Sequence, residues 1–193
     1  MMIHVRRALA LSIFAAACGL SACKEPQPPA DFSPEAGQAS TATPAAGAPL
    51  VEAPVELTYD QRRVALVPGL RCNLERVNGT AFAGAPMPVS KDESTRFSGW
   101  LADVETKQAP AEFDLRFVNV DSKRVWKANA KTGGARQDVQ TLLGGDAALA
   151  ATGYLSELDL GPLPDGTYRI YAVFQKNGQF LSCDNGRSIV IGS

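Results

Sequence analysis

The sequence predicts an all-β protein, folded as an antiparallel β-sandwich with one short crossover helix. After residue 54, short runs of alternating apolar and polar residues are separated by turn residues. The 17 glycines and 13 prolines among 193 residues favour many turns over long helices. With 45% hydrophobic and 20% charged residues, the composition is that of a folded protein, and the length leaves room for one domain.

Residues 1–22 are predicted to be a signal peptide. Residues 1–7 include Arg6 and Arg7, and residues 8–17 form an apolar run that is too short to span a bilayer. A basic stretch followed by such a run is typical of export signals.

The next four residues, Leu20-Ser21-Ala22-Cys23, resemble the lipobox of bacterial lipoproteins. The resemblance implies cleavage before Cys23, a lipid-modified Cys23, and attachment to a membrane through several acyl chains. The alternative is an ordinary secretory signal cut near residues 16–18. Lys24 follows the cysteine, and in having no aspartate at that position the chain resembles lipoproteins sorted to the outer membrane. We therefore expect a bacterial cell-envelope location, in the outer rather than the inner membrane.

Residues 23–54 are predicted to form the lipidated N-terminus and a disordered tether rich in proline and alanine. Such a segment cannot bury enough apolar surface to offset the entropy of ordering it. A recognition motif in residues 26–29 is the alternative to a simple spacer.

Residues 55–193 are predicted to form the β-sandwich. Phe113, Leu115 and Phe117 share one face of a strand, while Asp114 and Arg116 take the other, which predicts one dry and one wet side. Two sheets packed face to face would bury such dry sides. We expect strands over residues 64–67, 70–77, 94–104, 112–120, 124–130, 152–160, 167–175, 179–183 and 188–191.

The turn residues agree with this pattern. Asn177-Gly178 suits a tight hairpin turn, and residues 121–123 and 184–186 are predicted to close two further hairpins. Residues 163–168, Leu-Pro-Asp-Gly-Thr-Tyr, resemble the tyrosine corner of immunoglobulin-like sandwiches, which indicates that subclass. Between Arg136 and Leu143 the period becomes helical and predicts about two helical turns.

Cys72 and Cys183 are the cysteines that remain once Cys23 carries lipid and Cys18 is removed. Two cysteines on strands in an oxidising envelope are expected to form a disulfide. A free thiol or a metal ligand is the alternative, but neither a histidine nor a second nearby cysteine accompanies them.

Four short motifs occur in an order that resembles a β-sandwich accessory module found beside bacterial surface-glycan glycosyltransferases. They cover residues 98–103, 135–139, 153–154 and 163–168. Leu101 and Gln137 depart from the usual alanine and proline. The resemblance implies the sandwich fold over residues 72–191 and carries no transferase activity, because the transferase parts of those proteins have no counterpart in this chain.

We predict neither catalysis nor a cofactor nor a metal. His4 is the only histidine and lies in the signal peptide, which leaves the mature chain without a base for a histidine-dependent nucleophile. Of the 19 basic residues, Arg6 and Arg7 are lost with the signal peptide, leaving 17 against 20 acidic residues and no charge footprint for nucleic acid. An enzyme that uses carboxylates alone remains an alternative, with four candidates: Asp103, Glu105, Asp138 and Asp146.

The ligand-binding candidates are two aromatic and two charged side chains. Trp126 and Tyr171 would offer a platform to a sugar ring, with Trp100 assigned to the core. Arg136 and Asp138 would either meet a ligand or brace the crossover by hydrogen bonds. We therefore expect a lipid-anchored, non-catalytic interaction module for an envelope glycan or envelope protein.

Overall fold

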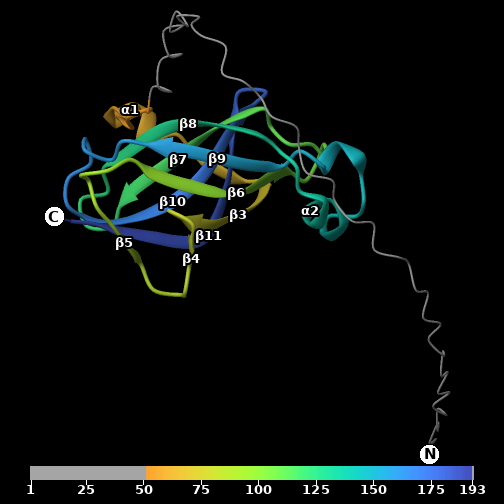
Figure 1. Ribbon diagram of the computed structural model, residues 1–193. Coiled ribbons are helices and arrows are strands. Elements are labelled where there is room, and N and C mark those ends of the chain that lie inside the picture. The colour runs from red at the N-terminus through yellow and green to blue at the C-terminus, as the bar shows by residue number, and fades with distance from the viewer. Residues whose placement is uncertain (1–50, 193) are drawn as a thin grey trace, which may run out of the picture. The chain divides into compact units, whose positions relative to one another are not determined.

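The computed structural model describes residues 51–192, which are mostly β-strand (Figure 1). The predicted signal peptide, Cys23 and the tether up to residue 50 lie outside the described residues. Within residues 51–192, none of the helices has the length and apolar character needed to cross a membrane.

Eleven strands alternate with two short α-helices and one 3-10 helix. The strands are β1 (Val55–Glu56), β2 (Leu66–Pro68), β3 (Leu70–Val77), β4 (Thr80–Ala81), β5 (Met87–Val89), β6 (Thr95–Asp103), β7 (Glu112–Asn119), β8 (Val125–Gly134), β9 (Gly153–Leu158), β10 (Gly166–Lys176) and β11 (Gln179–Ile191). The helices are α1 (Tyr59–Arg62), α2 (Gln137–Leu142) and the 3-10 helix η1 (Ala147–Leu149).

The strands form one continuous curled sheet in the order β2-β11-β10-β7-β8-β9-β6-β3-β4, with β1 beside β8 and β5 beside β11. The turn of the sheet occurs at β8, which pairs with β7 over residues 125–131 and with β9 only at Thr132 and Gly134. The two halves face each other across one core, where the Phe97 and Phe117 rings meet edge to face at 5.6 Å.

The predicted all-β class with a short crossover helix is confirmed, and two details differ from the expectation. Two separate sheets were expected, but hydrogen bonding runs through β8 from one half to the other. All strands were expected to be antiparallel, but β2 and β5 run parallel to β11. These two strands are only three residues long and reach β11 from loops, so local alternation carries no signal of their direction. The immunoglobulin-like subclass stays a prediction.

The predicted strands correspond to β2, β3 and β6 to β11, whereas β1, β4, β5 and α1 were not predicted. The end of the predicted tether also differs, because residues 51–54 already pack on the domain. Glu52 forms a bridge with Leu158, its side chain accepts a hydrogen bond from the Asn129 backbone at 2.7 Å, and Pro54 is buried.

The turn predictions hold at two hairpins and fail at a third. Asn177 and Gly178 have φ angles of 51° and 79° and join β10 to β11. The turn at residues 121–123 joins β7 to β8, with Asn119 Oδ1 accepting from two backbone N–H groups. Residues 184–186 do not close a hairpin: they form a bulge inside β11, where the register against β10 shifts between Arg169 and Tyr171. Asx hydrogen bonds and the positive φ of Gly186 serve a bulge as well as a turn.

Three further predictions are confirmed. The Tyr168 hydroxyl donates to the Pro164 carbonyl at 2.6 Å, as in a tyrosine corner. Helix α2 forms at the predicted place, in the connection between the neighbouring strands β8 and β9, and buries Val139. Cys72 on β3 and Cys183 on β11 form a disulfide, with Cα atoms 6.0 Å apart.

Candidate functional site

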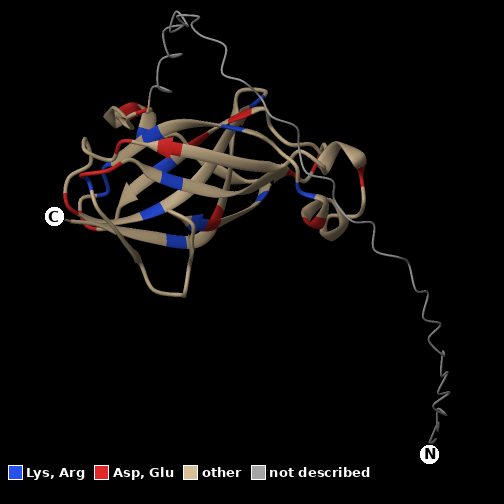
Figure 2. Cartoon of the chain, viewed as in Figure 1, with Lys and Arg blue, Asp and Glu red and all other residues tan. Residues whose placement is uncertain are grey.

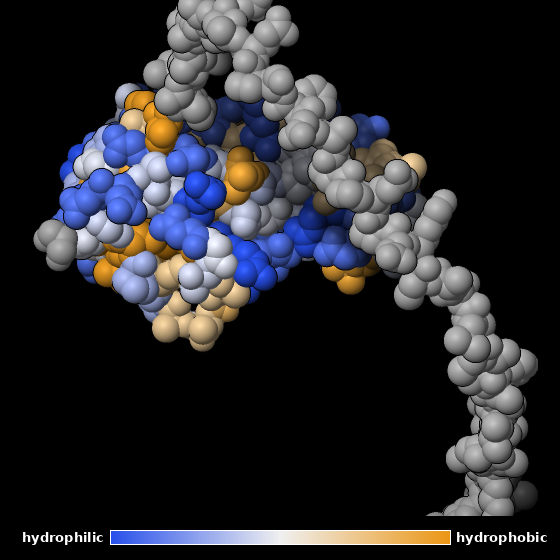
Figure 3. Space-filling view, viewed as in Figure 1, coloured by the Kyte–Doolittle hydropathy of each residue, from blue (hydrophilic) through white to orange (hydrophobic). Residues whose placement is uncertain are grey.

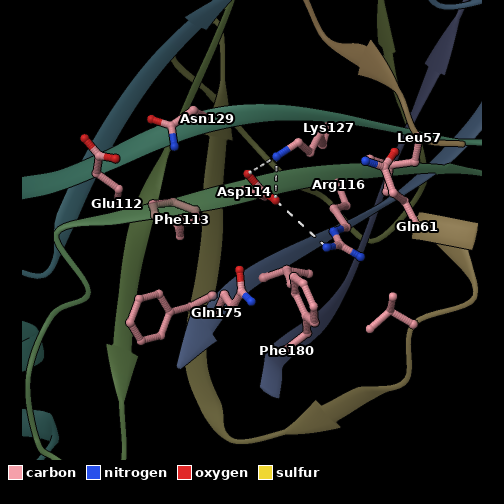
Figure 4. A pocket seen from close by; sticks show the side chains of 13 residues that line it. Leu57, Gln61, Glu112, Phe113, Asp114, Arg116, Lys127, Asn129, Gln175 and Phe180 are labelled. Carbon is pink, nitrogen blue, oxygen red and sulfur yellow. Dashed lines mark hydrogen bonds and ion pairs between the residues drawn. The ribbon is translucent and has the colours of Figure 1, made fainter. Parts of the chain in front are cut away.

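The outer face of the curled sheet carries a pocket of about 400 Å³ over β7, β8, β10 and β11 (Figure 4). Its floor is polar where β7 and β8 lie side by side. Its walls are apolar and come from β10, β11 and the segment around α1. Thr58 and Gln61 form a capping box that holds α1 beside the pocket.

Arg116 is the most unusual side chain of this pocket. Residue 116 is only 6% exposed, and Arg116 Nε has no hydrogen-bond partner among residues 51–192. Its charged neighbour Asp114 is 3.9 Å away, beyond hydrogen-bond distance. Because buried charges in proteins are normally paired and hydrogen-bonded, this arrangement is costly.

A second cation adds to that cost. Arg116 lies directly opposite Lys127 in the β7–β8 ladder, where like charges repel each other. Lys127 Nζ lies 3.3 Å from both Asp114 oxygens, so two cations share one carboxylate (Figure 4). Glu112 also lines the pocket, but it pairs with Lys131 at 3.1 Å. The cluster of Arg116, Lys127 and Asp114 therefore has one positive charge in excess.

The surroundings of Arg116 offset its burial only in part. Burial lowers the pKa of Arg116, and the nearby Asp114 carboxylate opposes that shift. The guanidinium lies 5.3 Å from the centre of the Phe180 ring, a cation–π contact. The site therefore favours an anion that enters the pocket and completes the coordination of the guanidinium.

The rest of the pocket suits an amphipathic ligand. Gln61, Asn129 and Gln175 bring amide groups to its rim, and all three residues are exposed. Apolar contact comes from Leu57, Val64, Val173, Phe174 and Phe180. Ligand pockets typically combine such walls with a few convergent polar groups.

Sequence reasoning placed Asp114 and Arg116 on a wet face and did not select them as a site. Phe180, whose ring lies 5.3 Å from the guanidinium, is far from Arg116 along the chain, so the burial of Arg116 had no local signal. The charge excess had no exact signal either. A turn at residues 121–123 between the predicted strands would place Arg116 opposite Ala128, whereas the observed register pairs it with Lys127.

The predicted aromatic platform is not formed. Trp126 is 3% exposed and packs edge to face on Tyr168 with ring centres 5.6 Å apart, so its ring is not open to a ligand. Tyr171 lies opposite Arg116 in the β7–β10 ladder and is half-buried, but Arg169 covers its ring at 5.7 Å. Trp100 is buried, as expected. Trp126 fills the core because its face of β8 points inward, which its neighbours Val125 and Lys127 did not reveal.

Arg136 and Asp138 form the brace that was the alternative to ligand binding. Arg136 donates to both Asp138 oxygens at 2.9 and 2.7 Å, and to both Glu75 oxygens on β3 at 2.9 Å. These bonds raise the pKa of Arg136 and lower that of Asp138 to about 2. The side chain crosses Gly153, where a Cβ would lie 2.9 Å from Arg136 Cγ. Three of the four motifs in the resemblance thus meet in one open groove, whose lining includes Ser98, Gly99, Ala135, Arg136, Gly153 and Tyr154.

The four carboxylates of the enzyme alternative are all engaged by structural partners. Lys176 Nζ binds Asp103 and Glu105, each at 2.8 Å, and Asp146 caps η1 through the Ala148 backbone. Burial acts to raise the pKa of Asp103, but hydrogen bonds from Lys176 and Thr106 and from the 105–106 backbone lower it overall. Asp103 lines two shallow cavities, neither of which is lined by any of the other three carboxylates.

The remaining surface is mixed in character. On the face in view, basic and acidic residues are interspersed over the strands (Figure 2), and apolar residues form small separate patches (Figure 3). Among residues 51–192, no three His, Cys, Asp or Glu side chains gather in a way that would hold a metal ion. A comparison with protein-family models, curated proteins and solved structures finds no match to this chain.

Proposed function

We propose that this protein is a lipid-anchored, non-catalytic module of the bacterial cell envelope that binds an acidic envelope glycan in the pocket around Arg116. The lipobox-like residues 20–23 support the anchor, and Lys24 supports the outer membrane. The proline- and alanine-rich stretch that follows would keep the domain near the membrane while allowing it to reach a ligand.

The observation that carries the binding role is the buried and underpartnered Arg116. Three neighbouring strands and a distant aromatic ring hold this guanidinium at a pocket with excess positive charge. If Arg116 served only the stability of the fold, a carboxylate closely paired with it, or an apolar side chain in its place, would be more stabilising. An anionic ligand accounts for retaining it.

The binding role is tested by the retention of the protein in native gels that contain purified acidic envelope polysaccharide or neutral dextran. We expect the acidic polymer alone to retard the wild-type protein, and Arg116→Met to abolish the retardation. Arg169→Met is the matched control, because Arg169 lies on the neighbouring strand β10, pairs with Asp184 and lies outside the pocket.

Circular dichroism and thermal unfolding establish that each variant is folded. If Arg116→Met does not fold, Lys127→Gln replaces it, since it also removes the excess charge. Retardation that a folded pocket variant leaves unchanged would contradict the proposed site.

The anchor is tested by Cys23→Ala. We expect the variant to lose labelled acyl chains and to leave the membrane fraction of cells that express the full chain. A Cys23→Ala protein that still carries label and still sediments with membranes would contradict the lipoprotein assignment.

A further inference from the structure

We infer that the group bound by Arg116 is the single carboxylate of a uronic acid residue, held with its sugar ring in the pocket. This inference rests on the proposed function and names the acidic group that the glycan carries. It follows from the charge of the site, the shape of the guanidinium and the type of polar groups at the rim.

The charge of the site matches one negative charge. Arg116 and Lys127 contribute two positive charges and Asp114 one negative charge, while Glu112 and Lys131 compensate each other. A carboxylate neutralises the remaining charge. A phosphate monoester near neutral pH carries between one and two negative charges, so it would leave an excess of negative charge next to the Asp114 carboxylate.

The shape of the guanidinium favours a planar partner. Two carboxylate oxygens match the parallel N–H groups of an arginine fork. Sulfate and phosphate add a further oxygen out of that plane. Asp114, 3.9 Å from the guanidinium, would repel such an additional charged oxygen, and the neighbouring Phe180 ring would offer it no hydrogen bond.

The rim favours a sugar over a peptide. The backbone of β7 beneath the pocket is paired with β8 on one side and with β10 on the other, so it offers no edge to an extended peptide. Recognition falls instead to the side-chain amides of Gln61, Asn129 and Gln175, each of which both donates and accepts, as sugar hydroxyls require. The apolar wall suits the C–H face of the ring, and about 400 Å³ lies within the usual range for small-ligand pockets.

The test is an NMR titration of the full chain with glucuronate, glucose, glucose 6-phosphate, glucose 6-sulfate and the peptide Gly-Glu-Gly, monitored at the backbone amides of β7 and β8. We expect glucuronate to bind at least about tenfold more tightly than glucose, which lacks the charged hydrogen-bonding partner. It should also bind more tightly than the phosphate, the sulfate and the peptide, which match the charge, the planar fork or the rim less well. Arg116→Met should remove glucuronate binding, and Arg169→Met should leave it unchanged.

A second variant, Asp114→Asn, tests the charge argument without removing the arginine. It adds one positive charge to the cluster, so the affinity for glucose 6-phosphate should rise relative to that for glucuronate. An unchanged ratio would contradict the charge match.

The outcomes separate this inference from the proposed function. If the phosphate, the sulfate or the peptide binds as tightly as glucuronate, the uronate assignment is overturned, even where acidic polysaccharide still retards the protein through Arg116. If neither the small anions nor the polysaccharide binds, the proposed function itself fails, and this inference fails with it.

Discussion

At the scale of single residues, Arg116 combines properties that rarely occur together. It is buried, it faces another cation across the ladder, and its carboxylate neighbour is shared. The Phe180 ring compensates for part of this, since a desolvated cation–π contact contributes about 2 kcal/mol. The rest of the fold must offset the remaining free-energy cost of burying this guanidinium. For this reason Arg116 is the clearest functional candidate in the described domain.

Tyr168 shows the opposite case, a buried polar group with an ideal partner. Its side chain is 0% exposed, packs against Trp126 and donates to the Pro164 carbonyl. Burial also raises the pKa of Tyr168, which keeps the hydroxyl protonated and able to donate.

Tyr168→Phe should lower the free energy of unfolding by about 1–2 kcal/mol, because the variant leaves a carbonyl without its donor. Urea titration followed by tryptophan fluorescence measures the change. Tyr59→Phe is the control: its hydroxyl accepts a bond from Arg63 on the surface, and its loss should cost less than about 0.5 kcal/mol. Equal effects of the two substitutions would contradict a role for the corner hydrogen bond.

At the scale of elements, the turn of the sheet depends on irregularities in β3 and β8. The register shifts at Glu75 on β3 and at Gly133 on β8. Close backbone contact follows at Gly99 on β6, where a Cβ would lie 2.0 Å from the Asn73 carbonyl oxygen. The Arg136 brace then ties the crossover helix to β3 through Glu75.

Gly99→Ala should therefore destabilise the domain by at least about 2 kcal/mol, because the added methyl group collides with backbone that cannot rotate away. Gly192→Ala, with nothing within 4 Å of its Cβ position, is the control and should change stability by less than about 0.5 kcal/mol. The difference in thermal midpoint between the two variants measures the effect. A Gly99→Ala protein as stable as the control would show that β3 and β6 can separate without loss.

At the scale of the whole molecule, the disulfide links strands near opposite ends of the sheet order. β3 and β11 are separated in that order by β6, β9, β8, β7 and β10, yet they contact each other once the sheet curls. Cys72 and Cys183 are 111 residues apart along the chain. The bond thus closes the curled sheet across the gap between its two halves.

Replacing both cysteines by alanine should lower the free energy of unfolding by about 4–5 kcal/mol, the loop-closure entropy of a chain segment of this length. Guanidinium titration of the double variant and of the oxidised wild-type protein measures the difference. Reduced wild-type protein should behave like the variant. A variant of wild-type stability would indicate that the two halves hold together through core packing alone.

Much of the domain could be predicted from local pattern. Alternation within each strand identified the seven longer strands, β3 and β6 to β11. Asn177-Gly178 identified its hairpin and residues 163–168 identified the tyrosine corner, because each signal lies within a few neighbouring residues. The disulfide followed by elimination, since Cys72 and Cys183 were the cysteines left to pair. The bulge at residues 184–186 was misread as a hairpin because the same Asx chemistry serves both.

The sequence by itself therefore determined the all-β class, the main strands and the cysteine pairing. Only the tertiary structure decided which polar residues are buried and whether they find partners. Trp126 is part of the core and Arg136 forms a brace, while Arg116 is buried next to the Phe180 ring from a distant part of the chain. Burial depends on which segments meet across the curled sheet, and those contacts leave no periodic trace in any one strand.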